Sequence, residues 1–208
     1  MKFYDCAAAP SPRRVRIFIA EKGIDVPVVQ VDLRAGEQLT DNFRAKNPRC
    51  TVPVLELDDG TCLGETLAIC DYLESIHPQP PLLGRDAKER ALVLQWNHRI
   101  EQDGFLAVAE MFRNSSPGFK DRALTGAENF AQIPELAERG RRRTEIFLRD
   151  LDARCAASQF VAGDAFSMAD ITAFVVVDFA LRLKMSIDDL PHVAAWHARI
   201  SARPSARL

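Results

Sequence analysis

The chain lacks both a long apolar run and a cysteine pattern typical of disulfide frameworks or zinc sites. Its five cysteines are scattered over 208 residues, and no two of them form a Cys-x-x-Cys pair. This usage favours a reducing, cytoplasmic location. No stretch approaches the length of a membrane-spanning helix, and the first residues do not have the pattern of a secretory signal.

An excess of charge of either sign is also absent. The chain carries 27 Lys and Arg against 29 Asp and Glu, a net charge of −2. This balance gives no electrostatic reason to expect nucleic acid or a membrane surface as a partner. The four histidines have no metal-ligand spacing, so no metal site is predicted. A hydrophobic content of 47% supports a real core, in one large domain or two small ones.

The N-terminal third predicts a small α/β unit. Residues 2–5 have strand composition, a helix follows from near Pro12 to Gly23, and a second strand spans 27–33. Because about twenty residues that contain a helix join these two strands, enough for a crossover connection, the strands are expected to be parallel. A polar loop with a short helix is expected over residues 36–46.

The next stretch predicts a hairpin that leads into a helix. Asp59-Gly60 is a strong hairpin signal between two short strands. Pro53 stands where the first of these strands begins, and a proline at such a position is a candidate for a cis bond. The backbone of Val52 is then expected to face a ligand. The helix that begins at Glu65-Thr66 offers unpaired N–H groups to a carboxylate.

A proline-rich break separates this part from the rest of the chain. Three prolines lie between residues 78 and 81, and they cannot continue a helix. We therefore predict a first domain over residues 1–77, a linker over 78–85 and a second domain over 86–208. No strand-turn-strand pattern follows the linker, so the second domain is expected to be all-helical.

The helical part contains four recognisable segments. Long amphipathic helices are predicted over 91–114 and 133–155, and a final one passes through Trp196 and Ile200. The stretch 171–183 is so apolar that it predicts a buried central helix. Ser167 and Asp170 before it form a capping box, in which each side chain satisfies a free N–H at the helix start.

Several short motifs together resemble one known family. They are Arg14-Val15-Arg16-Ile17 with Ala20-Glu21-Lys22-Gly23, Asn47-Pro48 before Val52-Pro53, Gly64-Glu65-Thr66 with Ala68-Ile69, and Ser167-Met168-Ala169-Asp170. In these motifs the chain resembles cytosolic glutathione S-transferases over essentially its whole length. It looks most like a fungal and bacterial branch of that superfamily, atypical in lacking the usual Tyr, Ser or Cys that activates the thiol.

The resemblance implies an architecture and an activity. It implies an α/β thioredoxin-like N-terminal domain that holds glutathione as co-substrate, and an all-α C-terminal domain with the electrophile pocket. The implied reaction joins the glutathione thiolate to small hydrophobic electrophiles, a detoxification activity. It also implies a cytoplasmic homodimer that uses no metal.

The resemblance also implies which residues hold glutathione: Gln38, Thr51, Val52, Pro53, Glu65 and Thr66. The Val52 backbone would bind the cysteinyl part beside a cis Pro53. Glu65 would pair with the γ-glutamyl ammonium, and Thr66 would bind the γ-glutamyl carboxylate. Gln38, with Thr51 as a further candidate, would meet the glycyl carboxylate.

The chain departs from the family where the thiol is activated, because Ala9 occupies the usual position. Three accounts stay open: Ser11 donates directly to the sulfur; the N-terminus of the first helix stabilises the thiolate with Arg113 and Asn114 on the long helix; or Cys6 forms a mixed disulfide. The second account is favoured. Two alternative functions also stay open: a glutathione-dependent thiol reductase or lyase that uses Cys6 or Cys50, and a non-catalytic glutathione-binding module.

Overall fold

The computed structural model describes residues 1–208, and they form two compact units. The first unit comprises Met1–Pro80 together with Leu124–Asn129 and Leu208. The second comprises Pro81–Ala123 and Phe130–Arg207. The division falls within the predicted linker, while the predicted domain limits themselves stay a prediction.

A four-stranded mixed sheet lies at the centre of the first unit. Its strands are β1 (Lys2–Asp5), β2 (Val28–Gln30), β3 (Val54–Glu56) and β4 (Cys62–Gly64), in the order β2-β1-β3-β4. β1 and β2 are parallel, as the β-α-β pattern predicts, and the other two pairings are antiparallel. β2 is shorter than predicted. The Asp32 carboxylate accepts the N–H groups of Arg34 and Ala35, and this turn directs the chain away from the sheet.

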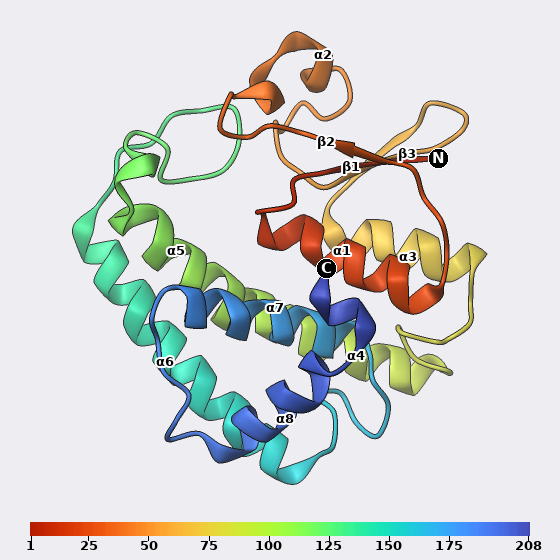
Figure 1. Ribbon diagram of the computed structural model, residues 1–208, viewed down its shortest axis with the longest axis vertical. Coiled ribbons are helices and arrows are strands. Elements are labelled where there is room, and N and C mark those ends of the chain that lie inside the picture. The colour runs from red at the N-terminus through yellow and green to blue at the C-terminus, as the bar shows by residue number, and fades with distance from the viewer. The chain divides into compact units, whose positions relative to one another are not determined.

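Helices cover both faces of this sheet. α1 (Pro10–Lys22) and α3 (Thr66–Ile76) lie side by side on one face (Figure 1). On the other face, a short 3₁₀ turn, η1 (Glu37–Leu39), leads into α2 (Asp41–Arg44). Phe43 of α2 packs in a small core with Tyr4 and Val54, residues whose side chains alternate with those facing α1. This small core holds the η1–α2 segment against the sheet.

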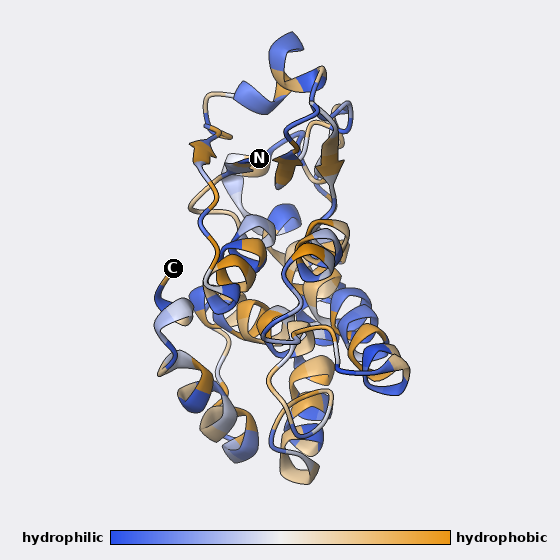
Figure 2. Cartoon of the chain, turned by 90° about the vertical axis from the view of Figure 1, so that its right-hand side faces the viewer, coloured by the Kyte–Doolittle hydropathy of each residue, from blue (hydrophilic) through white to orange (hydrophobic).

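The second unit is all-helical. Its helices are α4 (Ala87–Arg99), α5 (Leu106–Ser115), α6 (Pro134–Ala157), α7 (Met168–Arg182) and α8 (Pro191–Ser201), with a π-helical segment η2 (Ile100–Phe105) and 3₁₀ turns η3 (Pro117–Phe119) and η4 (Pro204–Arg207). α7 is buried on nearly all sides, as its composition predicts. The other helices contain both apolar and polar residues, as the colouring of Figure 2 shows.

The long helix predicted over 91–114 differs in its interior. It is divided into α4 and α5 by the π-helical turns of η2, which the 3.6-residue apolar spacing does not signal. Two glycines allow close packing here. A Cβ on Gly104 would lie 2.8 Å from the Phe147 ring, and one on Gly140 would lie 2.5 Å from the Met111 nitrogen. α5 and α6 therefore approach more closely than larger residues would permit.

The fold class predicted from the sequence is confirmed: a thioredoxin-like α/β unit and an all-α unit. None of the helices is both long enough and apolar enough to cross a membrane.

Candidate glutathione site

Glu65, directly before α3, has an unusual backbone and an exposed side chain. Its φ is 64° and its ψ is 126°, and its side chain provides no cap for the helix. The carboxylate lies 3.5 Å from the Arg49 guanidinium, with both side chains more than two-thirds exposed. A non-glycine residue in this region costs about 1–3 kcal/mol. An exposed ion pair offsets little of that cost, so helix stability does not explain the glutamate.

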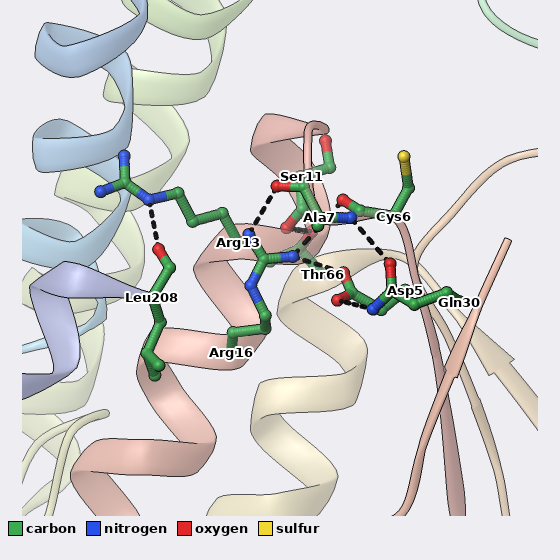
Figure 3. Close-up of polar contacts among 9 residues, drawn as sticks. All are labelled: Asp5, Cys6, Ala7, Ser11, Arg13, Arg16, Gln30, Thr66 and Leu208. Atoms are coloured by element: carbon green, nitrogen blue, oxygen red, sulfur yellow. Dashed lines mark hydrogen bonds and ion pairs between the residues drawn. The ribbon is translucent and has the colours of Figure 1, made fainter. Parts of the chain in front are cut away.

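The start of α3 is joined to the start of α1 by a buried arginine. The Arg14 Nη2 atom donates to Ser11 Oγ at 3.3 Å and to Thr66 Oγ1 at 3.2 Å. The Thr66 hydroxyl in turn donates to the Ser11 carbonyl oxygen at 3.4 Å. Ser11 and Thr66 therefore lie together (Figure 3). Two helix N-termini and a guanidinium that is only 4% exposed make this region suited to anionic groups.

Sequence reasoning did not single out Arg14 as a site residue. From the sequence alone, an arginine at the start of the first helix fits an anion binder and a structural ion pair equally well. A usable signal was the spacing, because residues three apart on a helix share a face and Arg14 follows Ser11 by three. The burial of Arg14 could not be read from that spacing.

The first turn of α1 offers a single free backbone donor. Two of its first three residues are prolines, which have no N–H, and no side chain caps the helix. The Ala9 N–H donates to the Cys6 carbonyl oxygen at 2.9 Å, and the Arg13 N–H donates to the Ala9 carbonyl oxygen at 3.3 Å. The Ser11 N–H has no acceptor in the chain. The positive end of the helix is therefore presented through Ser11.

The segment before β3 leaves the backbone groups of Val52 without a partner in the chain. The Val52–Pro53 peptide is cis. Asn47 Nδ2 donates to both oxygens of Thr51, at 2.8 Å to the carbonyl and 3.1 Å to the hydroxyl. Thr51 is thereby fixed, whereas Val52 makes no backbone hydrogen bond with the rest of the chain.

Gln38 lies in η1, on the segment that Phe43 anchors. Its Oε1 atom is buried without a hydrogen-bond partner. The segment is fixed locally, because Glu37 Oε2 accepts the Asp32 N–H at 2.7 Å. The predicted role of Gln38 at the glycyl carboxylate stays a prediction.

Two of the five cysteines, Cys62 and Cys155, lie in surroundings that do not favour a thiolate. Cys50 is 3% exposed, and its thiol donates to the Pro48 carbonyl oxygen at 3.7 Å. Burial raises the pKa of Cys62, and burial raises that of Cys155 to about 12. Cys6 is partly exposed. No group of three or more His, Cys, Asp or Glu side chains is arranged to hold a metal ion.

Arg113 and Asn114, predicted to assist catalysis, have partners within the helical unit. Asn114 is 7% exposed; its amide nitrogen donates to the Glu110 carbonyl oxygen at 2.9 Å and its Oδ1 accepts the Ile133 N–H at 2.9 Å. Arg113 Nε donates to the Ala123 carbonyl oxygen at 3.2 Å, and burial lowers the pKa of its guanidinium. Both residues brace α5 against the following segments, which helical spacing alone did not indicate.

Comparison with known families identifies the class of this protein. A model described as "Glutathione S-transferase, N-terminal domain" matches residues 8–76, and one described as "Glutathione S-transferase, C-terminal domain" matches residues 102–204. A fold with a thioredoxin-like unit and an all-helical unit defines this class. The chain belongs to the glutathione S-transferase family.

Individual relatives confirm the fungal and bacterial branch. The chain is 35% identical to Glutathione S-transferase 2 of Saccharomyces cerevisiae over 210 residues, which covers 100% of this chain and 88% of the relative. The crystal structure of Gtt2 from that yeast matches with a TM-score of 0.91 at 35% identity, over 100% of this chain and 99% of the other. A glutathione S-transferase domain-containing protein from Marinobacter aquaeolei matches with a TM-score of 0.91 at 41% identity, over 99% of both chains.

Proposed function

We propose that this protein is a cytoplasmic, homodimeric glutathione transferase that adds the glutathione thiolate to small hydrophobic electrophiles. In this reaction the thiol loses its proton to solvent. The sulfur then forms a bond to an electrophilic carbon. That carbon either releases a leaving group with its bonding electron pair or, where it belongs to a polarised double bond, gives up the π electron pair to the neighbouring atoms, which take a proton from solvent. The protein must therefore bind the tripeptide and lower the pKa of its thiol.

The observation that carries the proposal is the backbone of Glu65. A strained, exposed acidic residue at an uncapped helix start is explained by a ligand that carries both an ammonium and a carboxylate. The γ-glutamyl end of glutathione has both groups. Its ammonium pairs with Glu65, and its carboxylate meets the first N–H groups of α3 and the hydroxyl of Thr66, with Arg14 behind it.

In this proposal, the rest of the tripeptide lies along the segment before β3 and along η1. The cysteinyl part bonds to the open backbone groups of Val52 beside Pro53. The glycyl carboxylate meets Gln38, with Thr51 nearby. Because Asn47 holds Thr51 from behind, this stretch is set in place before the ligand arrives.

We assign thiolate stabilisation to the start of α1. The Ser11 N–H carries the positive end of that helix, and its hydroxyl, which accepts a hydrogen bond from Arg14, has its own hydrogen available to donate. Both donors favour the thiolate over the thiol. Arg113 and Asn114 are proposed to assist, although each is occupied by contacts within the helical unit.

Aromatic side chains in the helical unit suit the electrophile. The Phe112 ring lies 4.9 Å from the Phe119 ring and 5.3 Å from the Phe179 ring, in edge-on contacts. Phe112 and Phe119 are only partly buried, and the Arg113 guanidinium lies over the Phe119 ring at 4.5 Å. We propose that this group contributes to the electrophile pocket.

A test of the proposal compares glutathione with its analogue that lacks the γ-glutamyl amino group. Calorimetry on the wild type is expected to show binding of glutathione about tenfold tighter than of the analogue. Glu65→Gln is expected to bind both equally weakly, because only the pairing of carboxylate and ammonium separates them. Conjugation of a panel of electrophiles is measured alongside. Equal wild-type affinity for both ligands contradicts the proposed orientation.

Cysteine variants separate this proposal from a thiol reductase. Cys6→Ser and Cys50→Ser are each expected to keep wild-type conjugation, because the buried Cys50 thiol is already a donor to a carbonyl group. Loss of activity towards glutathione mixed disulfides in either variant would favour the reductase. Tight glutathione binding without turnover of any electrophile would favour a binding module. A solution mass near 23.2 kDa would contradict the dimer.

A further inference from the structure

The loop before α1 has a single hydrogen bond of its own, from the Ala9 N–H to the Cys6 carbonyl oxygen. Residues 6–9 are a cysteine and three alanines, of which Ala7 and Ala8 are exposed. No strand pairs with this loop, and its methyl side chains make no polar contacts. Yet this loop determines where the first turn of α1, and so Ser11, is placed.

Two side chains from other elements form hydrogen bonds with the backbone of one loop residue, Ala7. The Ala7 N–H donates to Gln30 Oε1 at 3.0 Å, and its carbonyl oxygen accepts from Arg16 Nη2 at 3.0 Å. Arg16 also donates to the Cys6 carbonyl oxygen at 3.4 Å. Gln30 comes from the end of β2 and Arg16 from α1, so the loop is held from two elements (Figure 3).

The side chains of Arg16 and Gln30 both donate to one buried carboxylate. Asp5, at the end of β1, is 1% exposed. Its Oδ1 accepts from Arg16 Nη1 at 2.5 Å and its Oδ2 accepts from Gln30 Nε2 at 2.7 Å. The four residues thus form a closed ring of hydrogen bonds. Charge-assisted bonds to a buried carboxylate are strong and fix the orientation of their donors.

We propose that Asp5, Arg16 and Gln30 are positioning residues for catalysis: they fix Ala7 and thereby aim the Ser11 donors at the sulfur of glutathione. The inference rests on the proposed function. None of the three residues touches the reacting atoms in this proposal. They act through the loop, in which the Ala9 N–H is bonded to the Cys6 carbonyl oxygen and the Arg13 N–H to Ala9. A small displacement of such a donor lowers its effect on a developing charge steeply.

Two variants test the ring without removing the buried Asp5 charge pair. Gln30→Met has a similar length but neither bonds Ala7 nor donates to Asp5. Arg16→Lys keeps the positive charge beside Asp5 but has one nitrogen in place of the two-armed guanidinium. It therefore separates loss of geometry from loss of charge. Val28→Met is the matched control, since Val28 is 53% exposed on the same strand and faces the same side as Gln30.

The measurement is the pKa of the thiol of enzyme-bound glutathione, followed by the ultraviolet absorbance of the thiolate. Gln30→Met and Arg16→Lys are each expected to raise this pKa by about one unit, with turnover below that pKa falling about tenfold. KM for glutathione is expected to stay within about twofold, because the contacts at Glu65 and Val52 are untouched. Val28→Met is expected to match the wild type. Hydrogen exchange of the Ala7 amide, measured without glutathione, is expected to be faster in both variants than in the wild type, because the loop is held less firmly.

The outcomes are distinguishable. A wild type that leaves the bound thiol at its free pKa overturns the proposed thiolate site, and the positioning role with it. A wild type that lowers the pKa, with both variants keeping that value, overturns the positioning role alone. A shift in Gln30→Met but none in Arg16→Lys also overturns it, since charge near the site would then suffice.

Discussion

The N-termini of two helices in this protein differ: α7 begins with a complete side-chain cap, whereas α3 begins with none. At α7, Ser167 and Asp170 form a complete capping box, and Asp170 also accepts the Val161 N–H and the Trp196 Nε1–H. Every atom of that carboxylate is used within the fold. At α3, the residue before the helix is also acidic, but Glu65 caps nothing and points to solvent. The same chemical group is structural where it is buried and available where it is exposed.

The comparison teaches how to separate structure from function at a helix start. A satisfied N-terminus contributes stability, and an open N-terminus leaves N–H groups for an anion. The start of α1 resembles that of α3 in being uncapped. Stability is therefore expected to depend on the α7 start, and activity on the starts of α1 and α3.

The largest effect is expected for Asp170→Ala. The substitution leaves the N–H groups of Val161 and Trp196 buried without an acceptor, and it removes the cap of α7. The free energy of unfolding is expected to fall by about 4 kcal/mol. Urea denaturation measures it. A loss below about 1 kcal/mol would mean that the two helix starts do not differ in the way described.

The pH dependence of stability should also separate the two helix starts. Burial raises the pKa of Asp170 from 3.8 to about 6. Because the folded state then binds the proton more readily than the unfolded state, the contribution of this group is fully present below about pH 4 and is lost as the pH rises through about 6. The free energy of unfolding of the wild type minus that of Asp170→Asn is expected to fall by up to about 3 kcal/mol over this window. If the difference in free energy of unfolding between the wild type and Asp170→Asn does not vary with pH, the raised pKa of Asp170 is contradicted.

The α1 start is tested by two substitutions of the same residue. Ser11→Pro removes both the hydroxyl and the free N–H, and is expected to lower turnover about hundredfold. Ser11→Ala, the matched control, removes only the hydroxyl and its contact with Arg14, so a smaller loss is expected. Steady-state kinetics with saturating glutathione measures both. If Ser11→Ala already abolishes turnover at unchanged glutathione affinity, the hydroxyl and not the helix N-terminus stabilises the thiolate.

The smallest effect is expected for Glu65→Gly. Glycine accepts the φ of 64° without strain, so the free energy of unfolding is expected to rise by about 1 kcal/mol while glutathione affinity falls. Glu65→Ala is the control: it loses the carboxylate but keeps the Cβ, so affinity falls without the gain in stability. Equal stability of the two variants would show that this backbone is not strained.

Local patterns predicted much of this architecture. The strand composition at residues 2–5, the glycine after α1, the Asp59-Gly60 hairpin and the capping box of α7 all appear as expected. Each depends on neighbours in sequence, such as a hydrogen bond across three residues or a backbone angle that one residue type accepts. The π-helical turns of η2 were not predicted. Gly104 in this segment lies against Phe147 of α6, a residue far along the chain, and local spacing does not show such a contact.

The candidate site shows the same limit. The sequence by itself predicted the cis bond at Val52–Pro53 and the helix start at Glu65-Thr66, since each motif is contiguous and its backbone chemistry is local. That these two motifs bind glutathione stays a prediction. Only the tertiary structure brought Arg14 between Ser11 and Thr66, and only it closed the ring of Asp5, Gln30 and Arg16 around Ala7. The Arg14–Thr66 contact and the ring join residues that are distant in the chain and meet only when the sheet and its helices are assembled. The spacing of Ser11 and Arg14 indicated only that the two share a helix face.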